Sequence, residues 1–207
     1  MSPTFDIRWS VQHRESIPLQ HQYSLLATLS RIVPEIHNDK RIGIHTIRGI
    51  HDGPGRLRLS ERSVVAIRAP LELVASLIPL SGKKLDLAGH LLRLGVATLH
   101  QIAPSGNLFC PIVTIKGFMD HNQFRGAVIR QLDSIKVRQS ITVDVGPRRI
   151  VRVKDSTIVG FSVLLAGLDA VESVRIQSEG IGGRRHFGCG IFSPSKSQNL
   201  QVRTEIQ

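Results

Sequence analysis

The sequence is poor in several residue classes, and each shortage excludes a kind of protein. Two cysteines in 207 residues are too few for a disulfide scaffold or a cysteine-rich zinc site. Aromatic residues make up only 4% of the chain, so we expect little stacking of nucleic-acid bases on aromatic rings. No run approaches 18 uncharged apolar residues, which argues against a membrane-spanning helix and a membrane partner. The first ten residues lack the apolar core of a signal peptide, so we expect a cytoplasmic protein with reduced thiols.

Positive charge is abundant and spread along the whole chain. There are 27 Lys and Arg against 16 Asp and Glu, a formal net charge of +11. Divided after Gly95, the two parts carry +5 and +6, so the excess is not confined to a tail. Of the basic residues 20 are Arg, whose planar guanidinium can bind a phosphate through two hydrogen bonds. Nucleic acid is therefore the leading partner class, and a basic protein without a polyanionic partner is the alternative.

The first part of the chain predicts the order β-α-β-β-α-β. Helical spacing of apolar residues indicates a helix that begins at Pro18, ends near Ile36 and is interrupted by Pro34, and a second helix over residues 70–80. Alternating or β-branched runs predict the strands, at residues 4–12, 41–48, 56–59, 64–68 and 84–94. This order is the split βαβ pattern of a ferredoxin-like domain.

The second part predicts the same order of elements without a repeat of sequence. Its strands are expected at residues 96–102, 107–116, 148–154, 157–166 and 187–192. Its helices are expected at residues 120–135, with Asp120 as the N-cap, and at residues 169–177. We therefore predict an α+β protein of two tandem ferredoxin-like domains, residues 1–95 and 96–207, with a polar tail after residue 194.

A glycine-rich segment near the C-terminus is the most distinctive motif. Five glycines lie within residues 180–190, beside the adjacent Arg184 and Arg185. Backbone N–H groups and guanidinium groups can approach a polyanion together in such a loop. The segment follows a predicted helix and precedes a strand, which is the reverse of a P-loop or a dinucleotide fingerprint. A glycine-rich turn with solvated arginines is the plain alternative.

This segment resembles the C-terminal glycine-rich loop of the RAMP superfamily, the RNA-binding proteins of CRISPR systems that are built from ferredoxin-like domains. Within that superfamily the chain resembles the CRISPR repeat-processing endoribonucleases, most closely the short Myxan-type form of type I systems. Besides the loop, the resemblance rests on short stretches spread over almost the whole chain: His21-Gln22-Tyr23, Glu35-Ile36-His37-Asn38, Gly43-Ile44-His45-Thr46-Ile47-Arg48-Gly49, Thr114-Ile115-Lys116-Gly117-Phe118-Met119 and Ile158-Val159-Gly160-Phe161.

The resemblance implies cleavage of CRISPR precursor RNA within the repeat, on the 3′ side of a hairpin, without a metal ion or other cofactor. The 2′-OH would attack the adjacent phosphate and leave a 2′,3′-cyclic phosphate and a 5′-OH. The implied partners are the repeat RNA, the mature guide RNA that the protein retains, and other CRISPR effector subunits. The absence of an acidic cluster in the sequence agrees with a metal-independent reaction.

The reaction needs groups that accept and donate protons and a cation for the charge on phosphorus. The resemblance places the catalytic histidine at His37, followed by the cations Lys40 and Arg41. Tyr23, Ser30 and His37 are spaced by seven residues and would share one edge of a helix.

His45 is the rival for this role, because it lies on the less apolar face of a predicted strand. A capping or surface histidine remains the plain alternative for His37, and a solvated strand histidine for His45.

Two groups of residues are the candidates for RNA binding. The first is the glycine-rich loop together with one lysine near the second predicted strand of the C-terminal part: Gly180, Gly182, Gly183, Arg184, Arg185, His186 and Lys116. The second is a basic run of alternating pattern that would grip phosphates: Arg148, Arg149, Arg152 and Lys154. An edge strand protected from aggregation by its charge is the alternative for the second group.

Three functions fit these patterns to different degrees. The leading interpretation is the endoribonuclease. A non-catalytic RAMP subunit of a CRISPR effector or of a CRISPR-guided transposon complex would share the fold and the loop, and only the histidines favour the enzyme. An RNA chaperone or ribosome-associated protein would explain the charge but not the loop.

Overall fold

The computed structural model describes residues 2–12, 16–138, 140–153 and 156–196. The chain forms two compact units, which are described one at a time. Unit 1 contains the residues up to Gln101 together with Val153 and His186–Gly188. Unit 2 contains Ile102–Arg152, Ser156–Arg185 and the residues from Cys189 onward. A short part of the glycine-rich segment therefore belongs to unit 1, although the rest of it belongs to unit 2.

Unit 1 is built on an antiparallel sheet whose strand order identifies the fold. From edge to edge the strands are β3 (Gly43–Ile44), β6 (Val64–Pro70), β1 (Thr4–Val11), β8 (His90–Gln101) and β7 (Lys84–Leu87). β1, β3, β6 and β8 are the first, second, third and fourth strands of a βαββαβ unit. Across the sheet they stand in the order second, third, first, fourth. This is the ferredoxin-like arrangement, to which β7 is added as a hairpin with β8.

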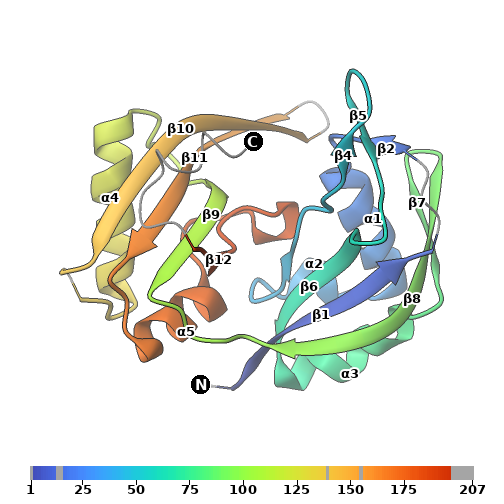
Figure 1. The fold of residues 1–207 in the computed structure, drawn as a ribbon, viewed down its shortest axis with the longest axis horizontal. Helices are drawn as coiled ribbons and strands as arrows, with labels where there is room; N and C mark the ends of the chain where they lie inside the picture. Colours follow the sequence, from blue (N-terminus) through green and yellow to red (C-terminus); the bar gives the residue numbers. More distant parts are fainter. Residues whose placement is uncertain (1, 13–15, 139, 154–155, 197–207) are drawn as a thin grey trace. The chain divides into compact units, whose positions relative to one another are not determined.

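Helices cover one face of this sheet, and their side chains form the core of unit 1 with alternate residues of β1. Ile7 and Trp9 of β1 are fully buried with Leu29 of α1 (Gln22–Ile32). The second helical segment is a run of η1 (Leu71–Leu73), α3 (Val74–Leu77) and η2 (Ile78–Leu80). Figure 1 shows α1 and α3 on the same side of the sheet. The opposite face carries the polar residues of β1, because neighbouring residues of a strand point to opposite faces.

The predicted helix over residues 18–36 is divided in the structure. Pro18 lies in a strand, α1 ends at Ile32, and Val33 is extended. Pro34 then starts a separate short helix, α2 (Glu35–Asn38). Proline has no N–H to continue the hydrogen bonding of the first helix, and it disfavours helical geometry in the preceding residue.

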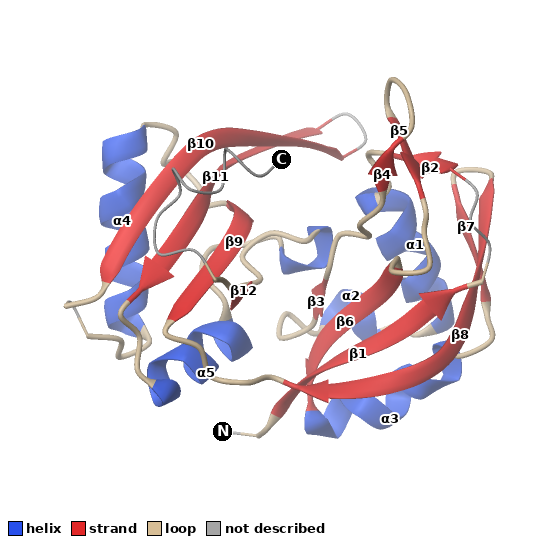
Figure 2. Ribbon diagram, in the orientation of Figure 1, coloured by secondary structure: helices blue, strands red, loops and turns tan. Residues whose placement is uncertain are grey.

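A small second sheet of unit 1 was not expected from the sequence. It contains β2 (Ser16–Pro18), β5 (Arg56–Arg58) and β4 (Ile50–His51). The predicted strand at residues 41–48 is reduced to the two residues of β3, and the strand at 56–59 lies in this second sheet instead of the main one. Figure 2 shows the loop between β4 and β5 projecting from it.

Unit 2 repeats the strand order of unit 1. Its sheet runs β10 (Thr142–Val153), β11 (Ser156–Ala166), β9 (Asn107–Val113) and β12 (Ser193–Pro194). Its helices are α4 (His121–Ser134) and α5 (Ala170–Glu179), whose apolar residues, such as Phe124 and Ile176, pack in the core with those of the sheet. The N-cap prediction is confirmed, because the Asp120 side chain accepts hydrogen bonds from the backbone of Asn122 and Gln123. Both halves thus have the predicted ferredoxin-like fold.

Two predicted strands of the second half are placed differently in the structure. Residues 96–101 continue β8 of unit 1 and pair with β1, so the predicted boundary after Gly95 falls inside a strand. The last strand is not at residues 187–192 but at Ser193–Pro194, preceded by the 3-10 turn η3 (Arg185–Phe187). Most of the predicted polar tail lies outside the described residues. Among those described, no helix is long and apolar enough to cross a membrane.

Glu172 joins α5 to the segment that follows α4. Its buried carboxylate accepts hydrogen bonds from the backbone N–H of Asp169 and of Arg138, and from the Arg138 guanidinium at 2.8 and 2.9 Å. The Asp169 side chain in turn accepts from the backbone N–H of Glu172, which completes a capping box. The hydrogen bond from Arg138 outweighs the effect of burial and lowers the pKa of Glu172 to about 2.

We expect Glu172→Gln to lower the free energy of unfolding by about 1–2 kcal/mol at pH 7, because Gln keeps one acceptor oxygen and replaces the other with an NH2 donor, so that the charge-assisted hydrogen bonds from Arg138 are weakened or lost. A carboxylate with a lowered pKa stabilises the fold above its unfolded pKa and loses that effect as the pH falls. The difference between wild type and variant should therefore shrink between about pH 5 and pH 2 in denaturant titrations. Glu179→Gln, at the exposed end of the same helix, is the control. A difference independent of pH would contradict this account.

Candidate active site

A buried ion pair lies at the centre of the polar face of the unit 1 sheet. Asp6 of β1 and Arg68 of β6 are directly opposite each other in the register of the two strands. Arg68 Nε donates to Asp6 Oδ1 at 2.7 Å, and Arg68 Nη2 donates to Asp6 Oδ2 at 3.0 Å. Asp6 is 5% exposed and Arg68 1% exposed. The two parallel hydrogen bonds hold the carboxylate in one orientation.

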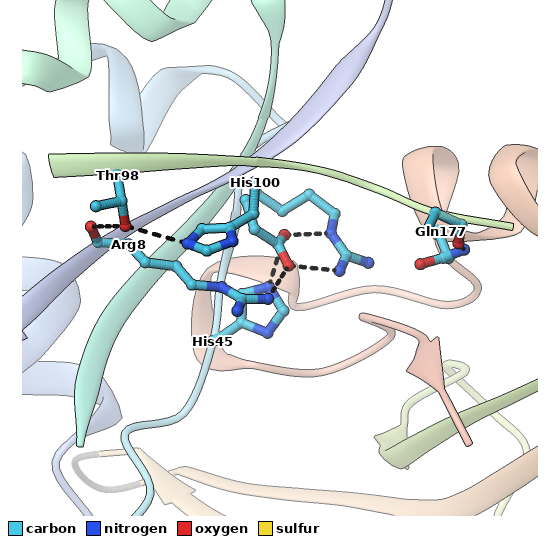
Figure 3. A network of polar contacts seen from close by, with 8 residues as sticks. Arg8, His45, Thr98, His100 and Gln177 are labelled. Atoms are coloured by element: carbon cyan, nitrogen blue, oxygen red, sulfur yellow. Dashed lines mark hydrogen bonds and ion pairs between the residues drawn. The ribbon is translucent and has the colours of Figure 1, made fainter. Parts of the chain in front are cut away.

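His45 is the third member of this group. It follows β3, and its backbone N–H donates to the carbonyl of Ala66 on β6 at 2.9 Å. Its Nε2 lies 3.2 Å from Asp6 Oδ1, and its side chain is 22% exposed. Arg8, two residues after Asp6 on β1, places Nη2 3.3 Å from Asp6 Oδ2. Figure 3 shows Arg8 and His45 meeting at this carboxylate, with Thr98 and His100 of β8 beside them.

The electrostatics of the group follow from these contacts. Burial by itself would raise the pKa of Asp6, but the hydrogen bonds from His45 and Arg68 outweigh it and hold that pKa well below its usual range. Burial lowers the pKa of His45, and the neighbouring Asp6 opposes this only in part. The carboxylate is therefore ionised and the imidazole neutral near pH 7. We refer to Asp6, Arg68 and His45 as the Asp6 group.

His37, the predicted catalytic residue, lies in a different setting. It is exposed on α2, and its side chain has no hydrogen-bond partner in the described parts of the chain. Lys40 is also exposed and forms no ion pair with a described residue. Arg41 differs, because its guanidinium pairs with Asp39 at 2.6 Å and with Glu72 at 2.7 Å. Of the two predicted cations, Lys40 is the one not engaged by carboxylates.

The structure does not place Tyr23, Ser30 and His37 along one helix as predicted. Tyr23 and Ser30 lie on α1, which ends before Pro34, and His37 lies on α2. Tyr23 and Ser30 are half-buried on α1. The Ser30 hydroxyl oxygen is itself buried and finds no hydrogen-bond partner among the described residues.

His21, which had no assigned role, is a fully buried residue at the N-cap of α1. Its Nδ1 lies 3.0 Å from the carbonyl of Pro18, and its Nε2 accepts the backbone N–H of Ile47 at 3.1 Å. Burial lowers its pKa. Both ring nitrogens are engaged in hydrogen bonds, so His21 links the start of α1 to Pro18 and Ile47 and has no nitrogen available for proton transfer.

Three residues within the glycine-rich loop, His186–Gly188, reach the segment that carries the candidate histidines. His186 Nε2 lies 3.0 Å from the backbone carbonyl of Asp39, two residues beyond His37. Gly188 has φ +81°, and a Cβ there would collide with the Thr46 hydroxyl, next to His45. Phe187 packs against the core of unit 1. Within unit 1 the structure therefore brings residues 186–188 against residues 39–46.

Gly180 and Gly182 of the loop pack closely against other protein atoms in unit 2. A Cβ at Gly182 would collide with the carbonyl of Thr114, and the N–H of Gly182 donates to Gln131 Oε1 at 2.6 Å. A Cβ at Gly180 would collide with the Arg185 guanidinium and with the carbonyl of Gly190. Steric packing inside the protein is thus a sufficient reason for these glycines. Gly183 is exposed, and a Cβ there would meet nothing within 4 Å.

The two adjacent arginines of the loop point to different environments. Arg185 is 8% exposed, and its Nη2 donates to the carbonyl of Ser178 near the end of α5 at 3.0 Å. Arg184 is exposed, with a left-handed backbone at φ +64°. Only Arg184 of this pair presents its charge to solvent.

The remaining predicted RNA-binding residues are exposed cations of unit 2. Lys116 follows β9, and Arg148, Arg149 and Arg152 lie on β10, which is the edge strand of its sheet. Lys154 lies outside the described residues.

Comparisons with known proteins identify the family. The model of the Cas6 CRISPR family matches residues 5–197. The chain belongs to the Cas6 family. It is 42% identical over 178 residues to the CRISPR-associated endonuclease Cas6 of Myxococcus xanthus, covering 86% of this chain and 76% of that protein. This relationship agrees with the resemblance to Myxan-type proteins found in the sequence.

Solved structures support the fold. A CRISPR-associated protein Cas6 superimposes with a TM-score of 0.66 at 12% identity, covering 95% of this chain and 100% of that one. The product of a Cas6-related gene from Pyrococcus furiosus gives 0.60 at 14%, covering 96% and 100%. A RAMP protein that binds different RNA substrates gives 0.64 at 13%, covering 94% and 100%. The tandem ferredoxin-like architecture is thus shared at low sequence identity.

Sequence reasoning missed the Asp6 group except for His45. Asp6 and Arg68 are 62 residues apart and become neighbours only through the pairing of β1 with β6. One signal was present in β6, where Arg68 interrupts an otherwise apolar run, whereas Asp6 is one of several polar residues that alternate with apolar ones along β1. A charged residue within an apolar strand predicts a partner of opposite charge on a neighbouring strand.

Proposed function

We propose that this protein cleaves CRISPR precursor RNA within the repeat, on the 3′ side of a hairpin, without a metal ion. The 2′-OH of the scissile nucleotide attacks its own phosphate, and the products end in a 2′,3′-cyclic phosphate and a 5′-OH. The observation that carries the proposal is 42% identity, over most of both chains, to a protein named as a CRISPR-associated endonuclease.

Two histidines of unit 1 supply the proton transfers. His37 is exposed on α2, and His45 is the partly exposed member of the Asp6 group, so that one histidine is available to accept a proton and another to donate one. Lys40 is the cation that faces the extra charge on phosphorus, because Arg41 is already paired with Asp39 and Glu72. We assign Ser30 and Tyr23, which are half-buried on α1, a structural and not a catalytic role in unit 1.

The exposed cations of unit 2 bind the RNA backbone. Arg184 is exposed on the glycine-rich loop, and Lys116 is exposed just after β9. Arg148, Arg149 and Arg152 are exposed along the edge strand β10. A row of arginines along a strand can follow the phosphates of an A-form hairpin, whose deep groove is too narrow for base readout. Unit 1 would carry the chemistry and unit 2 most of the binding. The same contacts would retain the guide RNA after cleavage and present it to other CRISPR effector subunits.

Cleavage of a labelled repeat hairpin should persist in EDTA, since the nucleophile belongs to the RNA and the proton transfers belong to histidines. A substrate with a 2′-deoxy scissile nucleotide should bind but remain intact. The upstream product should carry a cyclic phosphate. Strict dependence on Mg²⁺, or a 3′-OH product, would contradict the mechanism, and binding without cleavage would identify a non-catalytic RNA-binding subunit.

Arg184→Ala and Arg185→Ala form a matched pair that separates RNA binding from folding. Arg184→Ala should weaken hairpin binding and reduce the slope of log affinity against log salt by roughly one, with an unchanged melting temperature. Arg185→Ala should lower the melting temperature, because a buried side chain and its hydrogen bond to Ser178 are lost. If Arg184→Ala instead lowers the melting temperature and leaves RNA affinity unchanged, the loop does not bind RNA.

A further inference from the structure

The Asp6 group has an arrangement that the proposed function leaves unexplained. Two charged residues are buried side by side in a sheet, which costs a large desolvation penalty for each of them. A hydrophobic pair would fill the same place with no such penalty, so the fold alone does not require them. The third member, His45, is in contact with the buried carboxylate on one side and with solvent on the other, since 22% of its side chain is exposed.

We propose that Asp6, held in place by Arg68, positions His45 as the group that takes the proton from the attacking 2′-OH. This inference rests on the proposed function and deepens it by assigning the proton acceptor and its positioning residues. His45 is the catalytic member, and Asp6 and Arg68 act through it.

Asp6 determines which ring nitrogen of His45 carries the proton. Its Nε2 faces an ionised carboxylate oxygen at 3.2 Å, so we assign the proton to Nε2, which donates to Asp6. In a neutral ring this leaves an unshared electron pair on Nδ1, which can accept a proton. A carboxylate that holds a histidine by one nitrogen in this way also stabilises the imidazolium that forms when the other nitrogen is protonated.

Arg68 controls the charge and the orientation of the Asp6 carboxylate. Alone, a buried carboxylate would have a raised pKa and would turn toward any donor within reach. The paired bonds from Arg68 keep Asp6 ionised and fix the plane of its carboxylate, so that Oδ1 stays directed at His45. Arg8 adds a weaker contact to the other oxygen at 3.3 Å.

Other titratable groups surround this site on its neighbouring elements. Arg8 and Asp6 come from β1, Arg68 from β6, and His100 from β8, where it is opposite Asp6 in the register and bonds to the Thr98 hydroxyl at 3.1 Å. His186 comes from the glycine-rich loop and bonds to the carbonyl of Asp39. Among the described charged groups that act on His45, namely Asp6, Arg68 and Arg8, Asp6 is the only carboxylate, so the preference of His45 for one tautomer depends on it.

The step balances without a co-reactant. The 2′-O–H bond breaks as its proton moves to His45 Nδ1, and the 2′-oxygen forms a bond to phosphorus. The bond from phosphorus to the 5′-oxygen breaks, and that oxygen takes a proton from the imidazolium form of His37, which becomes neutral. The products are a cyclic phosphate and a 5′-OH, and proton exchange with solvent restores both histidines.

The direct test is the protonation of His45 in the free, full-length protein. Long-range ¹H–¹⁵N spectra of wild type should show His45 neutral at pH 7 with its proton on Nε2. An Nδ1-protonated or charged ring at pH 7 would overturn the inference whether or not the protein cleaves RNA. A correct tautomer in a protein that does not cleave repeat hairpins would instead contradict the proposed function.

The second test is Asp6→Asn, with His100→Gln on the same sheet face as the control. Asp6→Asn should lower the single-turnover rate at least tenfold, within the roughly 10²–10⁴-fold that a general base contributes, and leave hairpin affinity within about twofold. Removing the carboxylate removes what favours the charged ring, so the acid limb of the rate against pH should move to lower pH. His100→Gln should match wild type in rate and pH profile.

Because Asp6→Asn removes the carboxylate that neutralises the buried charge of Arg68, rates are compared at a temperature where circular dichroism shows the variant folded. A folded Asp6→Asn protein that cleaves within threefold of wild type, with an unshifted acid limb, would overturn the inference. If the variant does not fold at any temperature, the wild-type spectra decide.

Discussion

The buried pair of Asp6 and Arg68 is the interaction on which the proposed chemistry depends. It links the two central strands of the first ferredoxin-like sheet, and it leaves one carboxylate oxygen directed at His45. Such a pair adds little net stability, because the desolvation of two charges offsets most of their attraction. Its effect is to fix geometry: a histidine at the end of a two-residue strand would otherwise be free to turn, and here one ring nitrogen is held.

The fold was largely predictable because local patterns were strong. The order of strands and helices in both halves, the apolar face of α4 and its cap at Asp120 follow from periodicity and capping chemistry. The errors arose where tertiary pairing overrides local signals. β8 runs through the expected domain boundary because it pairs with β1 as far as Gln101. β2 is a three-residue strand that ends in proline, and its strand geometry comes from pairing with β5.

The proposed site was less predictable than the fold, because it combines residues that are far apart in the sequence. His37, Lys40 and His45 come from one short segment and could be named from it, but Asp6 and Arg68 require the register of β1 with β6. The glycine-rich loop shows the opposite difficulty. Its composition indicates phosphate binding, yet Gly180 and Gly182 are close to protein backbone and Arg185 is turned inward, so composition alone could not separate Arg184 from its neighbour.

The central claim is that histidines of this one segment carry the chemistry, and single-turnover cleavage at saturating protein tests it most directly. His37→Ala and His45→Ala are measured side by side on the same repeat hairpin. Each variant should lose about 10²–10⁴-fold in rate, because each removes one of two proton-transfer groups, while RNA affinity changes little. If both variants cleave within a few-fold of wild type and give the same products, the assignment of proton transfer to this segment is contradicted.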